Sequence, residues 1–289
     1  MANLYTYHMP RPTTQELKGF ITTVWNYYKE NARSFEWRED ITPYRIVVSE
    51  IMLQQTQADR VVPKFAAFIE QFPSWKDLAE AKPAQVLLAW KGLGYNSRAL
   101  RLQKLARYVC TLKPSELPSS YEALIELPGI GPNTAGSVLA FAYNIPRPFI
   151  ETNIRSVYIH HFFKNTDRAI NDLEILPIIE QTLDTENPRD WYYALMDYGV
   201  FLKKTYKNPS RKSQHHVKQS AFKGSRRELR AALLHHIALS PNHSRSLIIL
   251  KKFAQKFPQY SPQIFDTIMA ALIREGAIIA HKNSYSIPS

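Results

Sequence analysis

Apolar residues recur at helical spacing along most of the chain. In residues 14–31, for example, Leu17, Ile21 and Val24 fall on one face of a helix. The same periodicity, interrupted by prolines, predicts helices at 14–31, 43–57, 60–71, 74–80, 83–90, 95–110, 119–126, 132–143, 153–163, 172–183 and 188–202. No alternating apolar and polar run in this part is long enough for a sheet, so we expect the first 200 residues to be all-α.

The pattern changes after residue 202. Residues 203–227 contain nine Lys or Arg and no Asp or Glu, which indicates a basic connector on the surface. Helical patterns return at 226–239, 244–257 and 261–275, and short segments at 277–280 and 284–287 predict a terminal β-hairpin. Three helices and a hairpin are typical of winged-helix domains, which bind DNA or protein; both options stay open because the third helix is poor in basic residues. The expected domains are a helical core (1–202), a basic connector (203–225) and a small winged-helix-like domain (226–289).

Charge is distributed unevenly along the 289 residues. Residues 201–289 hold 16 Lys or Arg against 3 Asp or Glu, whereas residues 1–200 hold 21 against 22. The net charge of +12 indicates an acidic partner, although a basic surface that only aids solubility is the alternative. The N-terminus has no apolar signal core, and no run approaches about 18 uncharged apolar residues. We therefore expect no membrane partner and an intracellular protein, cytoplasmic or associated with the nucleoid.

A glycine-rich turn, Leu127-Pro128-Gly129-Ile130-Gly131, joins two predicted helices. Both glycines allow positive φ and leave no Cβ near the backbone, so their N–H groups and those of the next helix can converge on a phosphate oxygen. Leu127 and Ile130 would anchor the turn in the flanking helices. An ordinary helix–helix turn is the alternative, but Thr134-Ala135 and the helices on both sides favour phosphate binding. Glu151, 20 residues after Gly131, adds a lone carboxylate.

Together these segments resemble the helix-hairpin-helix DNA glycosylases. The matching motifs are Leu127–Ala135, Glu151-Thr152-Asn153, Gly92–Tyr95 and the run from Ser49 to Gln57. The Gln-Gln-Thr-Gln at the end of that run makes the chain most similar to the MutY-type adenine glycosylases, which remove adenine mispaired with guanine or 8-oxoguanine. The likeness extends from about Trp37 to Leu202. It implies an all-α core of two helical lobes and a monomer that binds double-stranded DNA containing a mismatch or lesion.

The resemblance also implies a role for each motif. Glu50 would be the general acid that protonates the adenine ring, because a purine leaves well only when it is protonated. Gln54 and Gln55 would enter the duplex and fill the gap left by the flipped base. Tyr95 would wedge between base pairs, although a simple core tyrosine is the alternative. The hairpin contacts to DNA would come from Leu127, Gly129, Gly131, Asn133 and Thr134.

Glu151 departs from the family pattern. Relatives carry Asp at this position, where it stabilises the oxocarbenium-like sugar or attacks it, and Asn153 would orient this carboxylate or a water. Glu is longer by one methylene, about 1.5 Å, and a displacement of about 1 Å can slow a reaction roughly 100-fold. Three outcomes are open: a pocket rebuilt around Glu, a different substrate, or slow or absent base removal.

Two further departures concern Lys and Cys. Bifunctional relatives carry a Lys just after the hairpin that forms a Schiff base with the sugar, whereas this chain has Asn133, so we expect no strand-cleaving lyase activity. Most relatives hold an iron–sulfur cluster on four cysteines, but Cys110 is the only cysteine here, so we expect no cluster, metal or other cofactor. The adjacent His215-His216 is a weak metal candidate. Direct phosphate contacts from the connector would be made by Lys207, Arg211, Lys212 and Lys218.

The predicted function is monofunctional excision of a mispaired or damaged base, with adenine opposite guanine or 8-oxoguanine as the expected substrate, leaving an abasic site for base excision repair. We expect a winged-helix-like unit in place of the domain that reads 8-oxoguanine in MutY-type enzymes, which leaves that preference open. One alternative keeps the fold and removes a deaminated or alkylated purine. The other is a non-catalytic protein that binds damaged or distorted DNA, but the presence of Glu50 argues against it.

Overall fold

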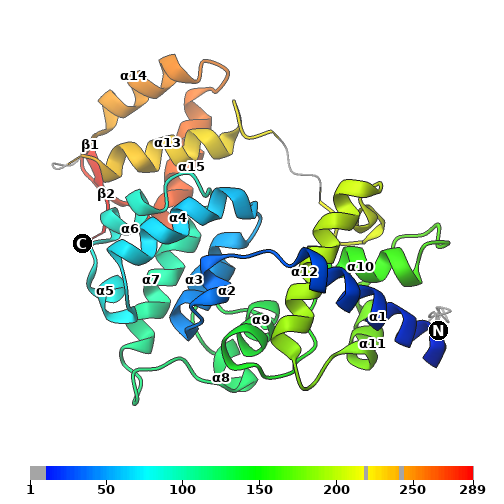
Figure 1. Cartoon of the computed structure of the whole chain (residues 1–289). Coiled ribbons are helices and arrows are strands. Elements are labelled where there is room, and N and C mark those ends of the chain that lie inside the picture. The colour runs from blue at the N-terminus through cyan, green and yellow to red at the C-terminus, as the bar shows by residue number, and fades with distance from the viewer. Residues whose placement is uncertain (1–10, 218–220, 241–243, 289) are drawn as a thin grey trace, which may run out of the picture. The chain divides into compact units, whose positions relative to one another are not determined.

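The computed structural model describes residues 11–217, 221–240 and 244–288, and most of them are helical (Figure 1). The helices before the basic segment are α1 (Thr14–Asn31), α2 (Glu36–Glu39), α3 (Pro43–Leu53), α4 (Ala58–Gln71), α5 (Trp75–Glu80), α6 (Pro83–Ala89), α7 (Ser97–Val109), α8 (Tyr121–Ile125), α9 (Pro132–Tyr143), α10 (Thr152–Phe162), α11 (Asp172–Thr182) and α12 (Pro188–Thr205). The expected all-α character of this part is confirmed. No helix in the described ranges is long and apolar enough to cross a membrane.

Local sequence signals determine where many of these helices begin. The Thr13 hydroxyl accepts from the N–H of Glu16, and the Glu16 carboxylate accepts from the N–H of Thr13, which forms a capping box on α1. Proline opens α3, α6, α9 and α12, where its missing N–H leaves no bond unmade. The ends are predicted less well: α3 stops at Leu53 rather than residue 57, and α12 continues to Thr205 rather than residue 202.

The chain folds into two compact units, and each combines separated segments. The first unit contains the described residues of 1–41, 119–121 and 131–218, and the second contains those of 42–118, 122–130 and 219–289. The expected division into core, connector and C-terminal domain follows sequence order and stays a prediction.

In the first unit, α1, α10, α11 and α12 pack around an aromatic core. The ring centroid of Phe20 on α1 is 5.1 Å from that of Tyr158 on α10 and 6.1 Å from that of Trp191 on α12. Both partners of Phe20 are completely buried. This packing holds α10, which begins directly after Glu151, along α12.

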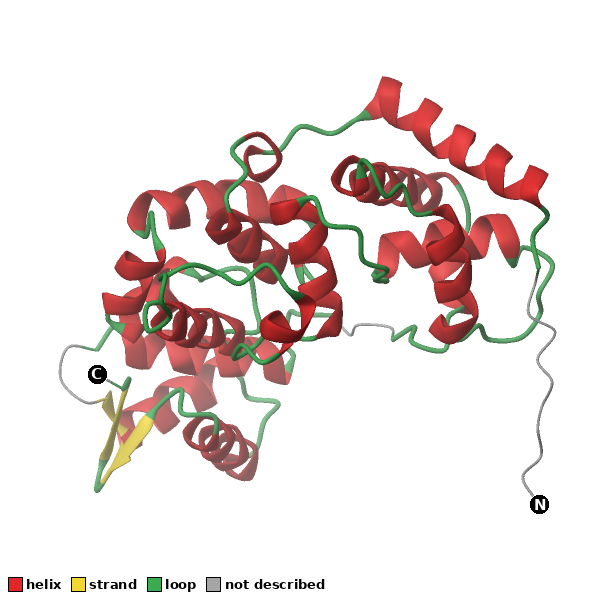
Figure 2. Cartoon of the chain, turned by 90° about the horizontal axis from the view of Figure 1, so that it is seen from below, coloured by secondary structure: helices red, strands yellow, loops and turns green. Residues whose placement is uncertain are grey.

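In the second unit, α3 to α7 surround a core that includes Phe65, Phe68 and Trp90. The same unit contains α13 (Arg226–Ala238), α14 (Ser246–Lys256) and α15 (Pro262–Arg274), and α13 packs on α6. The strands β1 (Ser244–Arg245), β2 (Ile279–His281) and β3 (Ser284–Ser286) pair antiparallel in the order β1-β3-β2. They are the yellow strands in Figure 2.

The terminal hairpin expected near residues 277–287 is confirmed as β2 and β3. The expected start of a helix at residue 244 is wrong, because Ser244 and Arg245 pair with β3 and α14 begins at Ser246. The assignment of these helices and strands to a winged-helix domain stays a prediction.

Candidate functional site

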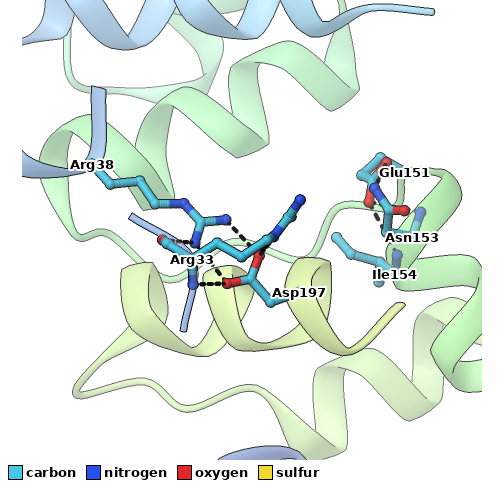
Figure 3. A network of polar contacts seen from close by, with 6 residues as sticks. All are labelled: Arg33, Arg38, Glu151, Asn153, Ile154 and Asp197. Carbon is cyan, nitrogen blue, oxygen red and sulfur yellow. Dashed lines mark hydrogen bonds and ion pairs between the residues drawn. The ribbon is translucent and has the colours of Figure 1, made fainter. Parts of the chain in front are cut away.

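Glu151 lies in extended backbone at the start of α10 and caps that helix. Its Oε1 accepts hydrogen bonds from the N–H groups of Asn153 (2.7 Å) and Ile154 (3.1 Å), and its Oε2 accepts one from Nδ2 of Asn153 (3.3 Å) (Figure 3). Helix N-caps are usually the shorter Asp, Asn, Ser or Thr, and here the longer Glu makes equivalent bonds. These donors and the helix dipole stabilise the negative charge of a carboxylate that is still partly exposed to solvent.

The backbone of α12 approaches the first turn of α10 closely at Gly199. A Cβ on Gly199 would lie 2.4 Å from the carbonyl oxygen of Asn153 and 2.8 Å from its Cβ, so only glycine fits here. One turn later on α12, burial lowers the pKa of Lys203, and the negative charge of Glu151 opposes that shift. Glu151 therefore has a basic side chain of α12 within electrostatic range, which the sequence pattern did not reveal.

Asp197, also on α12, is the centre of a buried ionic network that we did not predict. Its carboxylate pairs with Arg33 at 2.6 Å and with Arg38 at 2.8 Å, and it accepts the backbone N–H of Arg33 at 2.9 Å (Figure 3). Because the Asp197 side chain is only 1% exposed, these donors replace its lost hydration. The network fastens the segment after α1 to α12. An acid in the middle of α12, among apolar and aromatic residues, was the available signal, since a buried acid needs partners.

Glu50, the other predicted acid, lies on α3 in the second unit. Residues 46–49, 51 and 52 of this helix are buried, whereas Glu50 is partly exposed. The carboxyl group is therefore set in an apolar surface and is still reachable from solvent. A carboxyl in such a setting can exchange a proton with a bound group.

Arg98 of α7 binds two segments at once, and sequence reasoning missed it. Its Nη1 donates hydrogen bonds to the carbonyls of Ile51 (2.5 Å) and Gln54 (2.6 Å), and its Nη2 donates to those of Leu93 (3.1 Å) and Gly94 (3.2 Å). The side chain is 4% exposed, and burial lowers the pKa of Arg98 to about 10, so the guanidinium stays charged at neutral pH. Only its position three residues after the Gly92–Tyr95 motif could have indicated this role.

The carbonyls that Arg98 holds belong to the segments that present three predicted DNA contacts. Gln54 and Gln55 follow the end of α3, both are exposed, and Gln55 has a positive φ of 55°. Tyr95 has a φ of 45° and is 40% exposed, which excludes the alternative of a core tyrosine. The guanidinium carbon of Arg98 is 5.7 Å from the centroid of the Tyr95 ring. One buried cation thus supports exposed polar and aromatic side chains on neighbouring loops.

The hairpin Leu127–Gly131 joins α8 to α9. Leu127 and Ile130 are buried, at 4% and 5% exposure, and therefore anchor it as expected. Gly129 has a φ of 88°, whereas Gly131 has a φ of −97° as the N-cap of α9, so only Gly129 uses the positive φ that both glycines allow. A Cβ on Gly131 would meet nothing within 4 Å, so this position has open space beside the backbone. The first turn of α9 carries the exposed Asn133 and the partly exposed Thr134.

The basic segment after α12 is fixed to the loop between α10 and α11. The N–H of Ile170 donates to the carbonyl of Lys212 (2.8 Å), and the N–H of Gln214 donates to the carbonyl of Ile170 (2.9 Å). The ammonium group of Lys212 donates to the carbonyls of Lys164 (2.8 Å) and Thr166 (2.9 Å). Backbone hydrogen bonds and the Lys212 side chain thus hold the basic segment against the loop between α10 and α11, whereas the sequence alone predicts only a connector.

The four connector residues predicted to contact phosphate have different settings. Lys207 and Arg211 are exposed, Lys212 makes the internal bonds described above, and Lys218 lies outside the described residues. Within the described ranges, no three His, Cys, Asp or Glu side chains are grouped so that they could hold a metal ion. The single cysteine of the chain also gives no donor set for an iron–sulfur cluster.

The central part of this chain is similar to known proteins. Residues 48–176 match the family described as HhH-GPD superfamily base excision DNA repair protein. The chain is 34% identical over 184 residues to the adenine DNA glycosylase of Buchnera aphidicola subsp. Baizongia pistaciae, which covers 63% of this chain and 52% of that protein. It is 39% identical over 185 residues to the Mycobacterium tuberculosis adenine DNA glycosylase, with 62% and 60% covered. The chain spans about half the length of the curated relatives it matches.

Solved structures share the fold. A thermostable thymine-DNA glycosylase superposes with a TM-score of 0.60 at 24% identity, covering 69% of this chain and 93% of that one. A trapped endonuclease III–DNA covalent intermediate superposes with a TM-score of 0.57 at 17% identity, covering 66% and 88%. The family match at residues 48–176 confirms the expected resemblance to the helix-hairpin-helix superfamily, and the solved structures confirm the expected helical fold.

Proposed function

We propose that this protein is a monofunctional DNA glycosylase. The grounds are its match to the HhH-GPD base excision repair family and its similarity to MutY-type adenine DNA glycosylases. Its substrate is adenine mispaired with guanine or 8-oxoguanine, and its product is an abasic site. The observation that carries the proposal is the combination of Glu50, Gln54-Gln55 and Glu151 in a chain whose relatives, at 29–39% identity, are named adenine DNA glycosylase.

The reaction breaks the bond between N9 of adenine and C1′ of deoxyribose. Glu50 donates its proton to a ring nitrogen of the flipped adenine, and the electron pair of the bond leaves with the protonated base. The setting of Glu50 on α3 supports this role, because the residue is partly exposed beside buried neighbours and a bound base can reach its carboxyl group. Water then adds to C1′, and the proton that it releases returns the Glu50 carboxylate to its acid form.

Glu151 stabilises the positive charge that develops on the sugar. Its carboxylate is held in place by the N–H groups of Asn153 and Ile154, which supports preorganised electrostatic stabilisation. Because the extra methylene is folded into the cap of α10, we propose that the pocket is rebuilt around Glu. Asn153 completes the arrangement by donating its Nδ2–H to Oε2.

DNA binding in this proposal combines exposed polar, aromatic and backbone groups. Gln54, Gln55 and Tyr95 enter the duplex at the mispair, and the support from Arg98 holds them in position. The hairpin binds a backbone phosphate, which the open space beside Gly131 supports. Lys207 and Arg211 supply further phosphate contacts, and no iron–sulfur cluster is needed because hydrogen bonds fix this segment.

One observation favours a second class of substrate: Glu151 stands at a position where the MutY-type glycosylases carry Asp. A reshaped pocket accommodates a deaminated or alkylated purine, with the same acid and the same electrostatic stabiliser. In both cases Asn133 replaces the Schiff-base lysine of bifunctional relatives, so the abasic strand is left intact.

The test is an excision assay on end-labelled duplexes that each carry one A·G, A·8-oxoG, A·T, hypoxanthine or ethenoadenine site. Alkali reveals abasic sites, and a parallel sample without alkali reveals lyase activity. We expect alkali-dependent cleavage at A·G or A·8-oxoG and no cleavage without alkali. Cleavage only at another purine would select the second substrate class, and no cleavage on any duplex would refute the glycosylase proposal.

A further inference from the structure

The exposed ring of Tyr95 lies near two guanidinium groups of the second unit. The guanidinium carbon of Arg98 is 5.7 Å from the ring centroid, and that of Arg227, on α13, is 6.0 Å from it. Nη1 of Arg227 is also 3.5 Å from the Tyr95 hydroxyl. A residue 132 positions away in the sequence thus reaches the loop that carries the predicted DNA wedge.

The position of Arg227 is fixed by the start of α13. The Ser225 hydroxyl caps this helix by accepting the N–H of Glu228 (3.3 Å), and the carboxylate of Glu228 accepts the N–H of Gly224 (2.6 Å). The carbonyl of Gly224 is held by the side chains of Gln259 (3.1 Å) and Tyr260 (2.7 Å). Arg227, in the first turn, is therefore placed by an ordered turn.

Helix α13 also runs along the segment that leads to Tyr95. It packs on α6, which ends at Ala89, and the positive charge of Lys91 adds to burial in lowering the pKa of His235. Arg227 and His235 are two turns apart on α13, so α13 follows the segment before Tyr95 over most of the length of the helix. The contact at Tyr95 is one end of an extended packing surface.

Positive charge gathers around the same loop. The side chain of Arg60 donates to the carbonyl of Gly92, and Cε of Lys64 lies 3.6 Å from where a Cβ of Gly92 would be. Lys91 precedes this glycine, and the guanidinium groups of Arg98 and Arg227 lie near the ring. An exposed aromatic ring among cations is the surface that nucleic acid bases and phosphates bind.

We propose that α13 is part of the DNA-binding surface and that Arg227 contacts a phosphate beside the lesion while it holds the ring of Tyr95 for stacking. The inference rests on the proposed function, because it requires that Tyr95 enters the duplex. It gives the C-terminal domain a role in binding the lesion. The chemistry suits Arg, whose planar guanidinium can lie against a ring and bind a phosphate at the same time.

The test compares Arg227→Ala with Arg226→Ala in the full chain. Arg226 is the exposed neighbour on the same helix, so its substitution removes the same charge without the contact to Tyr95. Binding is measured by fluorescence anisotropy on a duplex that carries a tetrahydrofuran abasic analogue opposite guanine. We expect Arg227→Ala to weaken binding about 10-fold and to reduce the slope of log Kd against log salt by about 1. Arg226→Ala should change the affinity less than about 2-fold.

Two further variants guard against misfolding and separate the two roles. Arg227→Lys keeps the charge and the fold but loses the planar contact, and should weaken binding about 3-fold. In a Tyr95→Ala background, Arg227→Ala should have a smaller effect than in the wild type, because the two residues act as one unit.

If the wild type binds tightly and Arg227→Ala binds as well as Arg226→Ala, the inference is overturned while the proposed function stands. If the wild type does not bind the abasic duplex, both are overturned.

Discussion

Gly199→Ala tests how accurately α12 positions Glu151. The added Cβ would lie 2.4 Å from the carbonyl oxygen of Asn153, and ordinary contacts of this kind begin near 3.4 Å. The start of α10 or the backbone of α12 must therefore move by about 1 Å, because packed interiors transmit rather than absorb such strain. Asn153 carries two of the hydrogen bonds to Glu151, so the carboxylate moves with it.

The expected magnitude follows from that displacement. A misplacement of about 1 Å lowers the rate of base excision about 100-fold, which corresponds to about 2.7 kcal/mol of activation free energy. The free energy of unfolding should fall by about 1–2 kcal/mol, since overpacking destabilises the fold while Ala in place of Gly offsets part of the loss in a helix.

The assay is single-turnover excision on the preferred duplex, with the free energy of unfolding measured by urea denaturation. Gly19→Ala is the matched control, because Gly19 lies within α1 and nothing is within 4 Å of its Cβ position. It should leave excision unchanged and stabilise the protein by about 0.5–1 kcal/mol. If Gly199→Ala excises the base at the wild-type rate, the argument that α12 positions Glu151 is refuted.

Three other substitutions test the rest of the site. Arg98→Lys should lower excision at least about 10-fold and the free energy of unfolding by about 2–4 kcal/mol in urea titrations, because an ammonium cannot bridge the carbonyls that the guanidinium holds. Asp197→Asn should destabilise the protein by about 3–5 kcal/mol in the same titrations, because it leaves two guanidiniums without their counter-charge; an unchanged midpoint would contradict the network. Burial and the charge of His160 lower the pKa of His161 to about 4, below the value near 6.5 of the unfolded chain, so the folded state binds fewer protons between these values. The free energy of unfolding should therefore decrease as pH falls from about 6.5 to about 4, and His161→Asn should reduce that dependence.

Much of the helical fold could be predicted because its signals are local. Capping residues such as Thr13 and prolines at first positions mark where helices begin, and the apolar period marks which faces are buried. The buried anchors Leu127 and Ile130 of the hairpin were predicted on the same basis.

The remaining features depend on contacts between distant segments. The residues Leu53-Gln54-Gln55 contain no signal that ends a helix, yet α3 stops at Leu53. Arg98, 44 residues after Gln54, binds the carbonyl of Gln54 at this point. In the sequence, Gly199 cannot be distinguished from any other small residue of a helix, because its role depends on the close approach of Asn153 in the folded structure. Such tertiary effects override local propensity, and a single sequence gives no record of them.

The central claim is that the carboxylate of Glu151 stabilises the transition state of base excision, and Glu151→Gln tests it most directly. Gln can still accept the N–H groups of Asn153 and Ile154 with its one oxygen, so the cap of α10 is kept while the negative charge is lost. The measurement is the single-turnover rate of adenine release from an A·G duplex, with binding to the abasic analogue as the control. We predict a rate at least about 100-fold below that of the wild type with binding preserved. A variant that releases adenine at the wild-type rate would contradict the claim.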